Sequence, residues 1–560
     1  MSNQISIEVY ANNDDATIII QKPVIIKDCW GFAIYRKRKN ETDLEAEPLL
    51  TSVGFDGDPH VVDEMRPSTE WPIQKYIWTD YFVKMGDEIC YKVIPMIHSD
   101  AGLTKNLESA SEWSAWTIIG NTANAEGYFN RGLVSSQFVA RRLSNVPEKE
   151  RSKTLAANLA DENSAIKQFM GGNLLAALYQ LLDDVATNEK LKIYAALYEL
   201  NELGLIKRLN AIGDRANIIL ANGAFGQNDS DPQKKNADLL DKIRLTRRIV
   251  KTPHFAHNKF LVVTEVQDDQ TEKPVKVWTG STNWTTNGLH TQVNNAVVLK
   301  DKEVMDYYKA EWDKILEDCD PSGHGLYGSK YTDYNNTVRS NTAGSIHTYF
   351  TPVKNEIDMD EADKYIKAAK KGIMFLMFQP GVENKSRLLY DTIRSMAANP
   401  DLLINGVINA DPGGKDDPTI NFLHNNDEQA GDLNIVLPGS INSPFDYWMA
   451  ELGKKSVTIH SKVILIDPFS ENPVLMTGSH NMGNKASRSN DDNLNIIIGN
   501  KDLARAYAIH MASVYHHYRW RFYRAADTGK PKWSGNIKSD AWQQWYANGE
   551  KLKEINFWTT

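Results

Sequence analysis

The segment HSKVILID at residues 460–467 joins a histidine, a lysine two positions later and an aspartate that ends an apolar run. Two polar segments follow it, TGSHN at 477–481 and NDDN at 490–493. Together the three segments supply groups suited to one kind of chemistry: a nucleophile or acid, a fixed cation, and neutral hydrogen-bonding groups. Attack on a phosphodiester needs such groups, so the set predicts that reaction. A looser copy stands upstream, with HNK at 257–259, TGSTN at 279–283 and Asn294-Asn295.

The spacing of the two copies makes coincidence remote. A His-x-Lys triplet alone carries little information, because 13 histidines produce one easily. The ordered set, however, occurs twice with one spacing: Ser281 precedes Asn294 by 13 positions, and Ser479 precedes Asp492 by 13. The two motif histidines are 203 positions apart, about one domain length. This separation indicates an internal duplication.

The paired elements resemble the two HKD motifs of the phospholipase D superfamily, over roughly residues 125–525. The resemblance implies two similar α/β halves around a shared cleft, with one motif from each half. It also implies a reaction through a covalent phosphohistidine, with no metal and no cofactor. By resemblance, catalytic roles fall to His257, Lys259, His460 and Lys462, and phosphate binding falls to Ser281, Asn283, Ser479 and Asn481.

The first motif departs from the family pattern at one position. The second motif has its aspartate at Asp467, whereas the first has Thr264 there, followed by Glu265. By resemblance this aspartate supports the local fold rather than touching substrate, so we expect activity to survive its absence. The alternative is a first half that no longer takes part in catalysis. Retention of His257 and Lys259 favours an active first half.

The residues 13 positions after each serine are candidates for orienting the histidines. By resemblance, an acidic or amide side chain near this place hydrogen-bonds the imidazole. The spacing within each copy assigns Asn294 to His257 and Asp492 to His460. A neighbouring carboxylate favours an imidazolium, whereas an amide does not. The sequence therefore predicts that His257 is the neutral nucleophile and His460 the protonated general acid.

The whole chain is expected to be multidomain. Residues 1–120 hold short segments rich in β-branched and aromatic residues, which predicts an antiparallel β-sandwich. This part resembles a fibronectin type III or immunoglobulin-like module; we expect it to pack as an accessory domain, and substrate or surface recognition is the alternative. A duplicated α/β fold with pseudo-twofold symmetry follows. The expected divisions are a first half at 125–320, a linker at 321–345, a second half at 346–526 and a Trp-rich tail at 527–560.

Two segments carry apolar residues outside these expected cores. A long loop is expected over residues 411–442, and loops of that length are usually functional. The tail is expected to pack back on the domain, with contact to a membrane surface as the alternative. The tail tryptophans are Trp533, Trp542, Trp545 and Trp558. The apolar residues of the loop and its exit are Ile420, Phe422, Leu423, Ile435, Val436, Leu437, Pro444, Phe445, Tyr447 and Trp448.

The bulk composition limits compartment and partners. A net charge of −9 argues against a general nucleic-acid coat protein, but leaves room for a local positive cleft. Three cysteines far apart in sequence fit a reducing compartment better than a disulfide scaffold. No signal region or membrane-spanning run is recognised, so we expect a cytoplasmic protein, or one exported without a cleaved N-terminal signal. Neither a Cys/His metal cluster nor an obligate protein partner is evident.

Two substrate classes fit the predicted site. A phospholipase D would use the apolar loop at its mouth, although packing of that loop onto the domain explains it at least as well. An endonuclease acting on DNA or RNA would need a basic cleft, and a solvated helix face explains the basic segment equally well. The acidic total, the accessory domain and the loop favour the phospholipid. A non-enzymatic binding module with a relic site is the third class. The basic segment comprises Lys234, Lys235, Lys242, Arg244, Arg247, Arg248 and Lys251.

Overall fold

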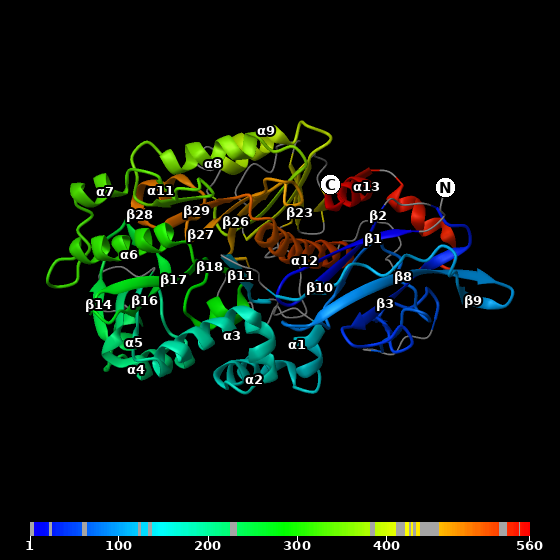
Figure 1. The fold of residues 1–560 in the computed structure, drawn as a ribbon, viewed down its shortest axis with the longest axis horizontal. Helices are drawn as coiled ribbons and strands as arrows, with labels where there is room; N and C mark the ends of the chain where they lie inside the picture. The colour runs from blue at the N-terminus through cyan, green and yellow to red at the C-terminus, as the bar shows by residue number, and fades with distance from the viewer. Residues whose placement is uncertain are drawn as a thin grey trace.

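The computed structural model of the chain describes residues 5–21, 25–58, 64–120, 125–132, 137–223, 232–380, 387–409, 420–424, 427–428, 433–436, 459–525, 535–547 and 549–559. Figure 1 shows two regions side by side. The N-terminal strands, in blue, lie at one end together with the C-terminal helix α13 (Gly549–Trp558), in red. Two α/β units occupy the other end.

The N-terminal region is rich in β-structure, as predicted. It contains two antiparallel sheets, β1-β2-β7 and β10-β8-β3-β4, with β9 beside β8 and a separate β5–β6 pair. Ile18, Phe32 and Tyr91 come from different strands and lie in one buried core. The strands are β1 (Ser6–Ala11), β2 (Ala16–Gln21), β3 (Cys29–Arg38), β4 (Glu47–Pro48), β5 (Leu50–Thr51), β6 (Arg66–Pro67), β7 (Ile77–Asp80), β8 (Glu88–Ser99), β9 (Gly102–Lys105) and β10 (Thr117–Ile118).

The first unit, residues 125–317, is built on a seven-stranded sheet in the order β11-β18-β17-β16-β12-β13-β14. Strands β12, β13 and β14 run parallel. Apolar side chains from helices α3 and α4 and from helix α6 pack with these strands, so the central strands are continuous apolar runs. Its strands are β11 (Ala125–Phe129), β12 (Leu191–Leu197), β13 (Ala216–Ala221), β14 (Arg244–Arg248), β15 (Phe255–Ala256), β16 (Lys259–Val266), β17 (Glu272–Gly280) and β18 (Asn295–Leu299), and its helices are α1 (Gln137–Arg142), α2 (Glu148–Ala160), α3 (Ala165–Thr187), α4 (Leu203–Ile212), α5 (Pro232–Ala237) and α6 (Lys302–Glu317).

The second unit, residues 346–525, has the same strand order. Its run β20-β29-β27-β26-β21-β22-β25 corresponds to β11-β18-β17-β16-β12-β13-β14, and β21, β22 and β25 are again parallel. Between the units lie α7 (Ser329–Asn335) and β19 (Arg339–Ser340). The second unit's strands are β20 (Ile346–Phe350), β21 (Gly372–Met377), β22 (Leu403–Ile408), β23 (Ile420–His424), β24 (Asp427–Glu428), β25 (Leu433–Val436), β26 (Lys462–Ile466), β27 (Val474–Gly478), β28 (Asn490–Asp491) and β29 (Asn493–Ile498), and its helices include α8 (Ile357–Lys367), α9 (Arg394–Met396), α11 (Asn484–Ser489) and α12 (Lys501–Ala525).

Helices α6 and α12 pack into a core that both units share. The Tyr308 hydroxyl on α6 lies 3.0 Å from Asn493 Oδ1 of the second unit. In return, Asn295 Nδ2 of the first unit donates to the Tyr507 hydroxyl on α12 at 3.0 Å. Each unit therefore places one helix tyrosine against a strand of the other unit.

Two expectations from the sequence were wrong in part. The basic segment before His257 is a solvated helix face only at α5, where Lys234 is exposed; its second half forms β14, which completes one edge of the first sheet by pairing with β13. The expected loop over residues 411–442 contains β23, β24 and β25, because its apolar stretches extend the second sheet beyond β22. The rest of that segment, and the apolar residues from Leu437 to Trp448, lie outside the described residues.

The C-terminal segment packs back on the protein, chiefly on the N-terminal sheets. Trp542 is fully buried beside Phe32 and Tyr76, and its indole N–H donates to the carbonyl oxygen of Cys29 at 2.9 Å. Trp545 is 47% exposed, and Trp533 lies outside the described residues.

The last helix joins the N-terminal region to the second unit. The ring of Trp558 on α13 packs between Tyr10 of β1 and Phe469 of the second unit, with centroid distances of 6.3 and 4.7 Å. In the part of the chain that the structure describes, no helix has the length and apolar character to cross a membrane.

Candidate active site

The two His-x-Lys elements begin equivalent strands at equivalent sheet positions. Lys259 opens β16 opposite Leu197 at the end of β12, and Lys462 opens β26 opposite Met377 at the end of β21. The carboxyl ends of parallel strands are the places where α/β sheets bind ligands. Both elements therefore stand where a ligand site is expected.

Backbone contacts dock each element on the other unit. The His257 N–H donates to the carbonyl oxygen of Asp491, and the His460 N–H donates to that of Val293, both at 2.9 Å. Strand β15, just before His257, also pairs in parallel with β28 of the second unit. The two motifs thus lie together, and neither is complete within its own unit.

The orienting partners of the histidines are exchanged between the units. His257 Nδ1 lies 2.7 Å from Asp492 Oδ1, and His460 Nδ1 lies 3.0 Å from Asn294 Oδ1. The assignment of Asn294 to His257 and of Asp492 to His460 was therefore wrong. Sequence spacing could not reveal that each segment following its serine crosses to the opposite unit.

Both orienting side chains are held by further hydrogen bonds. Asn294 Nδ2 donates to the carbonyl oxygen of Gly288 at 2.8 Å, which turns its Oδ1 toward His460. Asp492 Oδ2 accepts from Asn490 Nδ2 at 3.1 Å, so Oδ1 is left for His257. Since both partners offer an acceptor, each neutral imidazole carries its proton on Nδ1 and has its lone pair on Nε2.

The two motif lysines are buried with the histidines. Lys259 Nζ and Lys462 Nζ each donate to the carbonyl oxygen of the histidine in the same motif, at 2.6 Å. Burial lowers the pKa of Lys259 to about 7 and the pKa of His257 to about 4, in both cases against the attraction of Asp492.

The second motif is shifted in the same direction. Burial and the nearby positive charges of the site lower the pKa values of Lys462 and His460. Burial alone would raise the pKa of Asp492, but His257 and its hydrogen bond keep that pKa below its usual value. The buried Asp492 and the half-buried Glu199, which both act on Lys259, therefore face two motif lysines and two motif histidines. Such a site is stabilised by a bound anion.

The two serines occupy equivalent positions. The N–H of Asn295 donates to Ser281 Oγ, and the N–H of Asn493 donates to Ser479 Oγ, both at 3.0 Å. The Ser281 hydroxyl donates in turn to Asn294 Oδ1 at 2.7 Å. This serine therefore shares its acceptor with His460.

The two motif asparagines differ in their surroundings. Asn283 Nδ2 donates to Glu199 Oε2 at 3.0 Å. The second unit has Gln379 at the position equivalent to Glu199, directly after the aromatic residue that follows the strand. It therefore has no carboxylate there. Within the described residues, Asn283 Oδ1 and Asn481 Oδ1 are buried without a hydrogen-bond partner. Buried polar atoms of this kind are typical of places that a ligand or water completes.

Two threonine–asparagine pairs link the units reciprocally. Thr279 donates to Asn493 Oδ1 at 2.8 Å, and Asn295 Nδ2 donates to Thr477 Oγ1 at 2.8 Å. All four side chains are fully buried. The pairs therefore fix the register in which the two motifs meet.

Sequence reasoning missed two aromatic rings in the site. Lys259 Nζ lies 4.7 Å from the centroid of the Tyr198 ring, and Lys462 Nζ lies 5.0 Å from that of Phe378. The same rings lie 4.7 Å and 4.8 Å from the imidazoles of His257 and His460. Both residues directly follow a parallel strand, and that position was the available signal.

Asp467 stands at the opposite end of β26 from Lys462 and holds a turn. Its carboxylate accepts the backbone N–H groups of Lys370, Lys371 and Gly372, at 2.8, 2.7 and 2.9 Å. In the first unit Thr264 is buried within β16 and donates to Glu272 at 3.1 Å. The changed residue therefore lies in the sheet, away from the motif's histidine and lysine.

Other titratable residues of the second motif are used within the fold. His480 stands where the first copy has Thr282, and its Nε2 forms a fully buried ion pair with Asp358 at 3.0 Å. Asp358 also accepts from the Ser487 hydroxyl at 2.5 Å. Over the described residues, no group of three or more His, Cys, Asp or Glu side chains is arranged to hold a metal ion.

Part of this chain is similar to known proteins. The family described as "Cardiolipin synthase, PLD-like domain" matches residues 187–316. Mitochondrial cardiolipin hydrolase of Mus musculus is 23% identical over 232 residues, which cover 41% of this chain and 93% of that protein.

Two solved structures are similar at low identity. Phosphatidylserine synthase of Haemophilus influenzae Rd KW20 has a TM-score of 0.40 and 12% identity, over 72% of this chain and 98% of that chain. Nuc of Salmonella typhimurium, a phospholipase D family member, has a TM-score of 0.20 and 19% identity, over 25% of this chain and 87% of that chain. By the family match, residues 187–316 of this chain are similar to a phospholipase D-like domain.

Proposed function

We propose that this chain is a metal-independent phosphoric diester hydrolase in which His257 attacks phosphorus and His460 protonates the leaving oxygen. One observation carries the assignment: the two histidines have chemically different partners, a carboxylate for His257 and an amide for His460. A carboxylate that accepts the Nδ1 proton stabilises the positive charge that the ring gains on attack. An amide gives no such stabilisation, so a protonated His460 is the stronger acid. His257 and His460 keep the roles predicted from the sequence, but for a different reason. The carboxylate lies beside the nucleophile and not beside the acid.

In the first step a bond forms between His257 Nε2 and phosphorus while the bond to the leaving oxygen breaks. The leaving oxygen takes the Nε2 proton of His460, and the phosphoryl group stays on His257 as a phosphohistidine. Lys259 and Lys462 balance the charge on the non-bridging oxygens. The motif residues Asn283, Ser479 and Asn481 donate neutral hydrogen bonds to the same oxygens, and Ser281 joins them when its hydroxyl turns away from Asn294.

Binding of substrate supplies the condition under which His460 is protonated. In the free site, burial and then the charges of Lys462 and Lys259 lower the pKa of His460. A phosphodiester anion between the lysines reverses this effect, because an opposite charge favours the protonated form. The acid therefore forms when the substrate enters.

The second step regenerates the site. The now neutral His460 accepts a proton from water, the water oxygen bonds to phosphorus, and the bond from phosphorus to His257 breaks. The products are a phosphomonoester and free His257. An alcohol in place of water gives a new diester, which on a phospholipid is transphosphatidylation.

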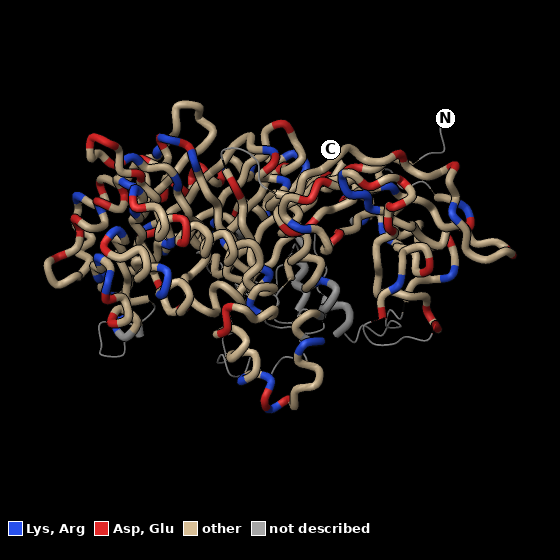
Figure 2. Tube along the Cα trace, turned by 60° about the horizontal axis from the view of Figure 1, so that its bottom comes forward, with Lys and Arg blue, Asp and Glu red and all other residues tan. Residues whose placement is uncertain are grey.

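We propose a glycerophospholipid as the substrate. The matched relative is named for cardiolipin hydrolysis and the matched family for cardiolipin synthesis, and both names refer to phospholipid chemistry. The basic segment is less available to nucleic acid than its sequence indicated. Arg248 is 1% exposed, and Arg247 donates to the carbonyl oxygen of Leu220. Figure 2 shows lysines and arginines interspersed with aspartates and glutamates along the chain.

The remaining regions are assigned supporting roles. We propose that residues 1–120 and the tail form an accessory unit beside a duplicated pair of halves, 125–320 and 346–526, related by a pseudo-twofold axis. The matching strand orders of the two sheets support the pairing. The contacts of Trp542 with Phe32 and Tyr76 support grouping the tail with the N-terminal sheets.

One purified preparation tested on two substrates decides between lipid and nucleic acid. With EDTA present, we expect phosphatidic acid from phosphatidylcholine vesicles, phosphatidylethanol when ethanol is added, and neither product with His257→Gln. Nicking of supercoiled DNA in EDTA that His257→Gln abolishes would instead make the chain an endonuclease of the same superfamily. Failure to cleave both substrates and bis(para-nitrophenyl) phosphate would reject the proposed activity.

A further inference from the structure

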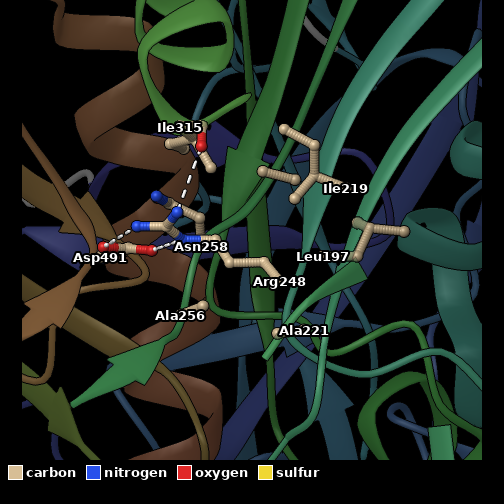
Figure 3. A pocket seen from close by; sticks show the side chains of 9 residues that line it. Leu197, Ile219, Ala221, Arg248, Ala256, Asn258, Ile315 and Asp491 are labelled. Carbon is tan, nitrogen blue, oxygen red and sulfur yellow. Dashed lines mark hydrogen bonds and ion pairs between the residues drawn. The ribbon is translucent and has the colours of Figure 1, made fainter. Parts of the chain in front are cut away.

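Arg248 is the last residue of β14 and is buried between the two units, with 1% of its surface exposed. Its basic neighbours Lys242, Arg244 and Lys251 are exposed. Figure 3 shows its guanidinium reaching from the first unit to Asp491 of the second. Burial of a charged group is unfavourable unless the group is paired and hydrogen-bonded, so these contacts require an explanation.

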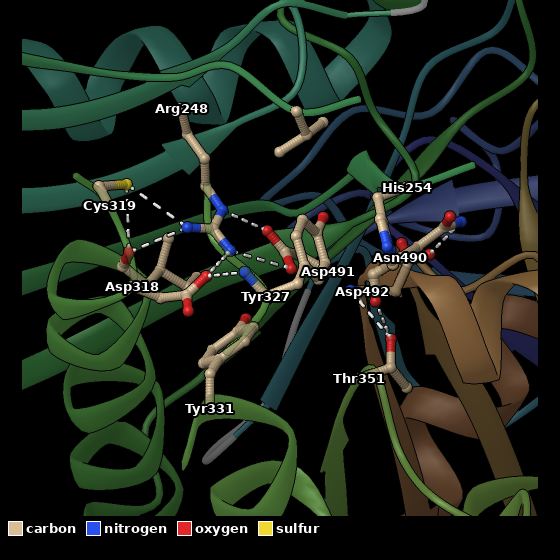
Figure 4. A network of polar contacts seen from close by, with 12 residues as sticks. Arg248, His254, Asp318, Cys319, Tyr327, Tyr331, Thr351, Asn490, Asp491 and Asp492 are labelled. Atoms are coloured by element: carbon tan, nitrogen blue, oxygen red, sulfur yellow. Dashed lines mark hydrogen bonds and ion pairs between the residues drawn. The ribbon is translucent and has the colours of Figure 1, made fainter. Parts of the chain in front are cut away.

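Every N–H group of the guanidinium has an acceptor. Nε donates to Asp491 Oδ2 at 2.6 Å, and Nη2 reaches Asp491 Oδ1 at 3.4 Å and Asp318 Oδ2 at 3.0 Å. Nη1 donates to the carbonyl oxygen of Ile315 at 3.2 Å and to Cys319 Sγ at 3.4 Å. Figure 4 shows this network and its continuation to Asp492 and Thr351. A planar fork bound on all sides fixes the orientation of its partners.

Asp491 connects this network to the proposed nucleophile. Its carbonyl oxygen accepts the N–H of His257 at 2.9 Å. The next residue, Asp492, accepts from the His257 ring at 2.7 Å, and its own N–H donates to the Thr351 hydroxyl at 3.1 Å. Two adjacent aspartates therefore act together: Arg248 holds the first, and the second holds His257.

We propose that Arg248 is a positioning residue for the reaction, which by fixing the Asp491 side chain sets the place where Asp492 meets His257. This inference rests on the proposed role of His257 as nucleophile. Arg248 acts through these two aspartates, since its donors are all used within the network. A displacement of about 1 Å in a reacting group lowers the rate on the order of 100-fold, so kcat rather than KM is expected to respond.

A small cavity beside the guanidinium allows a direct test. Its volume is about 10 Å³, room for about one water molecule. Asn258, which lines it, has a buried Nδ2 with no partner among the described residues. Removal of the Arg248 side chain adds its volume to this cavity, so a free guanidinium ion can enter and bind Asp491 and Asp318.

The test is the kinetics of Arg248→Ala on bis(para-nitrophenyl) phosphate. We expect kcat to fall on the order of 100-fold with little change in KM. Guanidinium chloride should restore part of kcat, and potassium chloride at the same concentration should not. Arg248→Lys should lie between the wild type and Arg248→Ala, because one ammonium cannot reproduce the fork between Asp491 and Asp318. Arg244→Met is the matched control: it removes an exposed arginine from the same strand and should leave kcat unchanged.

A purely architectural role for Arg248 predicts other results. Thermal stability would fall, but kcat per folded molecule would stay at the wild-type value and guanidinium would restore nothing; these outcomes overturn the proposal. If Arg248→Ala does not fold, two isosteric variants decide. Asp491→Asn should lower kcat much more than Asp318→Asn, because only Asp491 adjoins Asp492. Equal effects of the two variants would also overturn the proposal.

A readout independent of activity separates this inference from the proposed function. A histidine Nδ1 proton that is hydrogen-bonded to a buried carboxylate gives a strongly downfield proton NMR signal. The signal is assigned to His257 if it disappears in His257→Gln. We expect this signal to move or vanish in Arg248→Ala and to persist in Arg244→Met. An unchanged signal in Arg248→Ala overturns the positioning role. An inactive wild type whose signal is displaced in Arg248→Ala rejects the proposed function and leaves the positioning role supported.

Discussion

The Nδ1 atom of His257 lies 2.7 Å from Oδ1 of Asp492, a residue 235 positions later in the chain and part of the other unit. The reciprocal contact joins His460 to Asn294, 166 positions earlier, at 3.0 Å. Each unit thus supplies the histidine that the other orients. The two partners differ in charge, and on this difference rests the proposal that His257 is the nucleophile and His460 the acid.

Asp492→Asn should reduce kcat on the order of 100-fold with little change in KM. The amide oxygen can still accept from His257 Nδ1, so the ring keeps its orientation, but the negative charge that stabilises the ring during attack is lost. Initial rates on bis(para-nitrophenyl) phosphate measure the effect. A loss seen mainly in KM would mean that Asp492 serves substrate binding rather than the nucleophile.

Asn294→Asp should raise the pKa of His460, because a carboxylate beside the ring favours its protonated form. The limb of the pH–rate profile that reports the acid should move to higher pH. Rates should fall most for diesters with poor leaving groups, since a weaker acid assists them less. An Asp492→Asn/Asn294→Asp double variant exchanges the two partners, and phosphohistidine trapping should then label the peptide that contains His460. Labelling only at His257 in the double variant would show that the partners do not set the roles.

Anion binding should weaken as the pH rises through about 7. Burial lowers the pKa of Lys259 to about 7 in the free site, so above that pH the lysine is neutral and binding must take up a proton. Each proton taken up lowers the affinity roughly tenfold per pH unit. Sulfate is a suitable probe because its own charge is constant in this range. Calorimetry should show proton uptake on binding, and Lys259→Met should reduce the slope of the sulfate affinity against pH. An affinity that stays constant from about pH 6 to about pH 9 would contradict the lowered pKa of Lys259.

The sequence was sufficient for the β-rich N-terminal region and for strand β26. The apolar run between Lys462 and Asp467 identified β26 because this strand is buried on both faces. The order His, Lys, Ser, Asn occurs twice in the sequence, and this repetition identified both motifs. Each copy follows one pair of neighbouring strands, β16 and β17 in the first unit and β26 and β27 in the second. Neither inference needed knowledge of how the two units dock.

Relations between the units could not be read from the chain. The exchange of Asp492 and Asn294 depends on which segment crosses the interface, and spacing is the same for either arrangement. The burial of Arg248 likewise depends on Asp491, 243 positions away. The basic segment looked solvated because its partners, Asp318 and Asp491, are distant in sequence and adjacent only in the fold.

Asp467→Asn should destabilise the second unit by about 2 kcal/mol, the usual contribution of hydrogen bonds to a charged acceptor. Its two carboxylate oxygens accept three backbone N–H groups at the start of β21, and an amide has one oxygen and would turn an N–H toward a donor. The melting temperature should fall while kcat per folded molecule stays at the wild-type value. Thr264→Asp is the companion variant, and it should leave kcat unchanged, since that position lies within β16 away from the site. A drop in kcat for Asp467→Asn without loss of stability would assign this residue to the reaction.

Trp542→Ala should destabilise the N-terminal region by about 3–5 kcal/mol, the usual range for truncating a buried aromatic residue. The side chain is fully buried against Phe32 and Tyr76, and its indole N–H donates to the carbonyl oxygen of Cys29. Its loss leaves both a cavity and an unpaired carbonyl group in a core that the tail completes. Calorimetry should therefore show that the N-terminal region unfolds at a lower temperature than in the wild type. Limited proteolysis should cut the two ends of the chain sooner. Trp545→Ala, three residues on and 47% exposed, is the matched control and should change neither property. Because the tail contacts the N-terminal sheets rather than the histidines, kcat at a temperature where Trp542→Ala stays folded should equal that of the wild type; a lower kcat under those conditions would show that the accessory unit takes part in forming the active site.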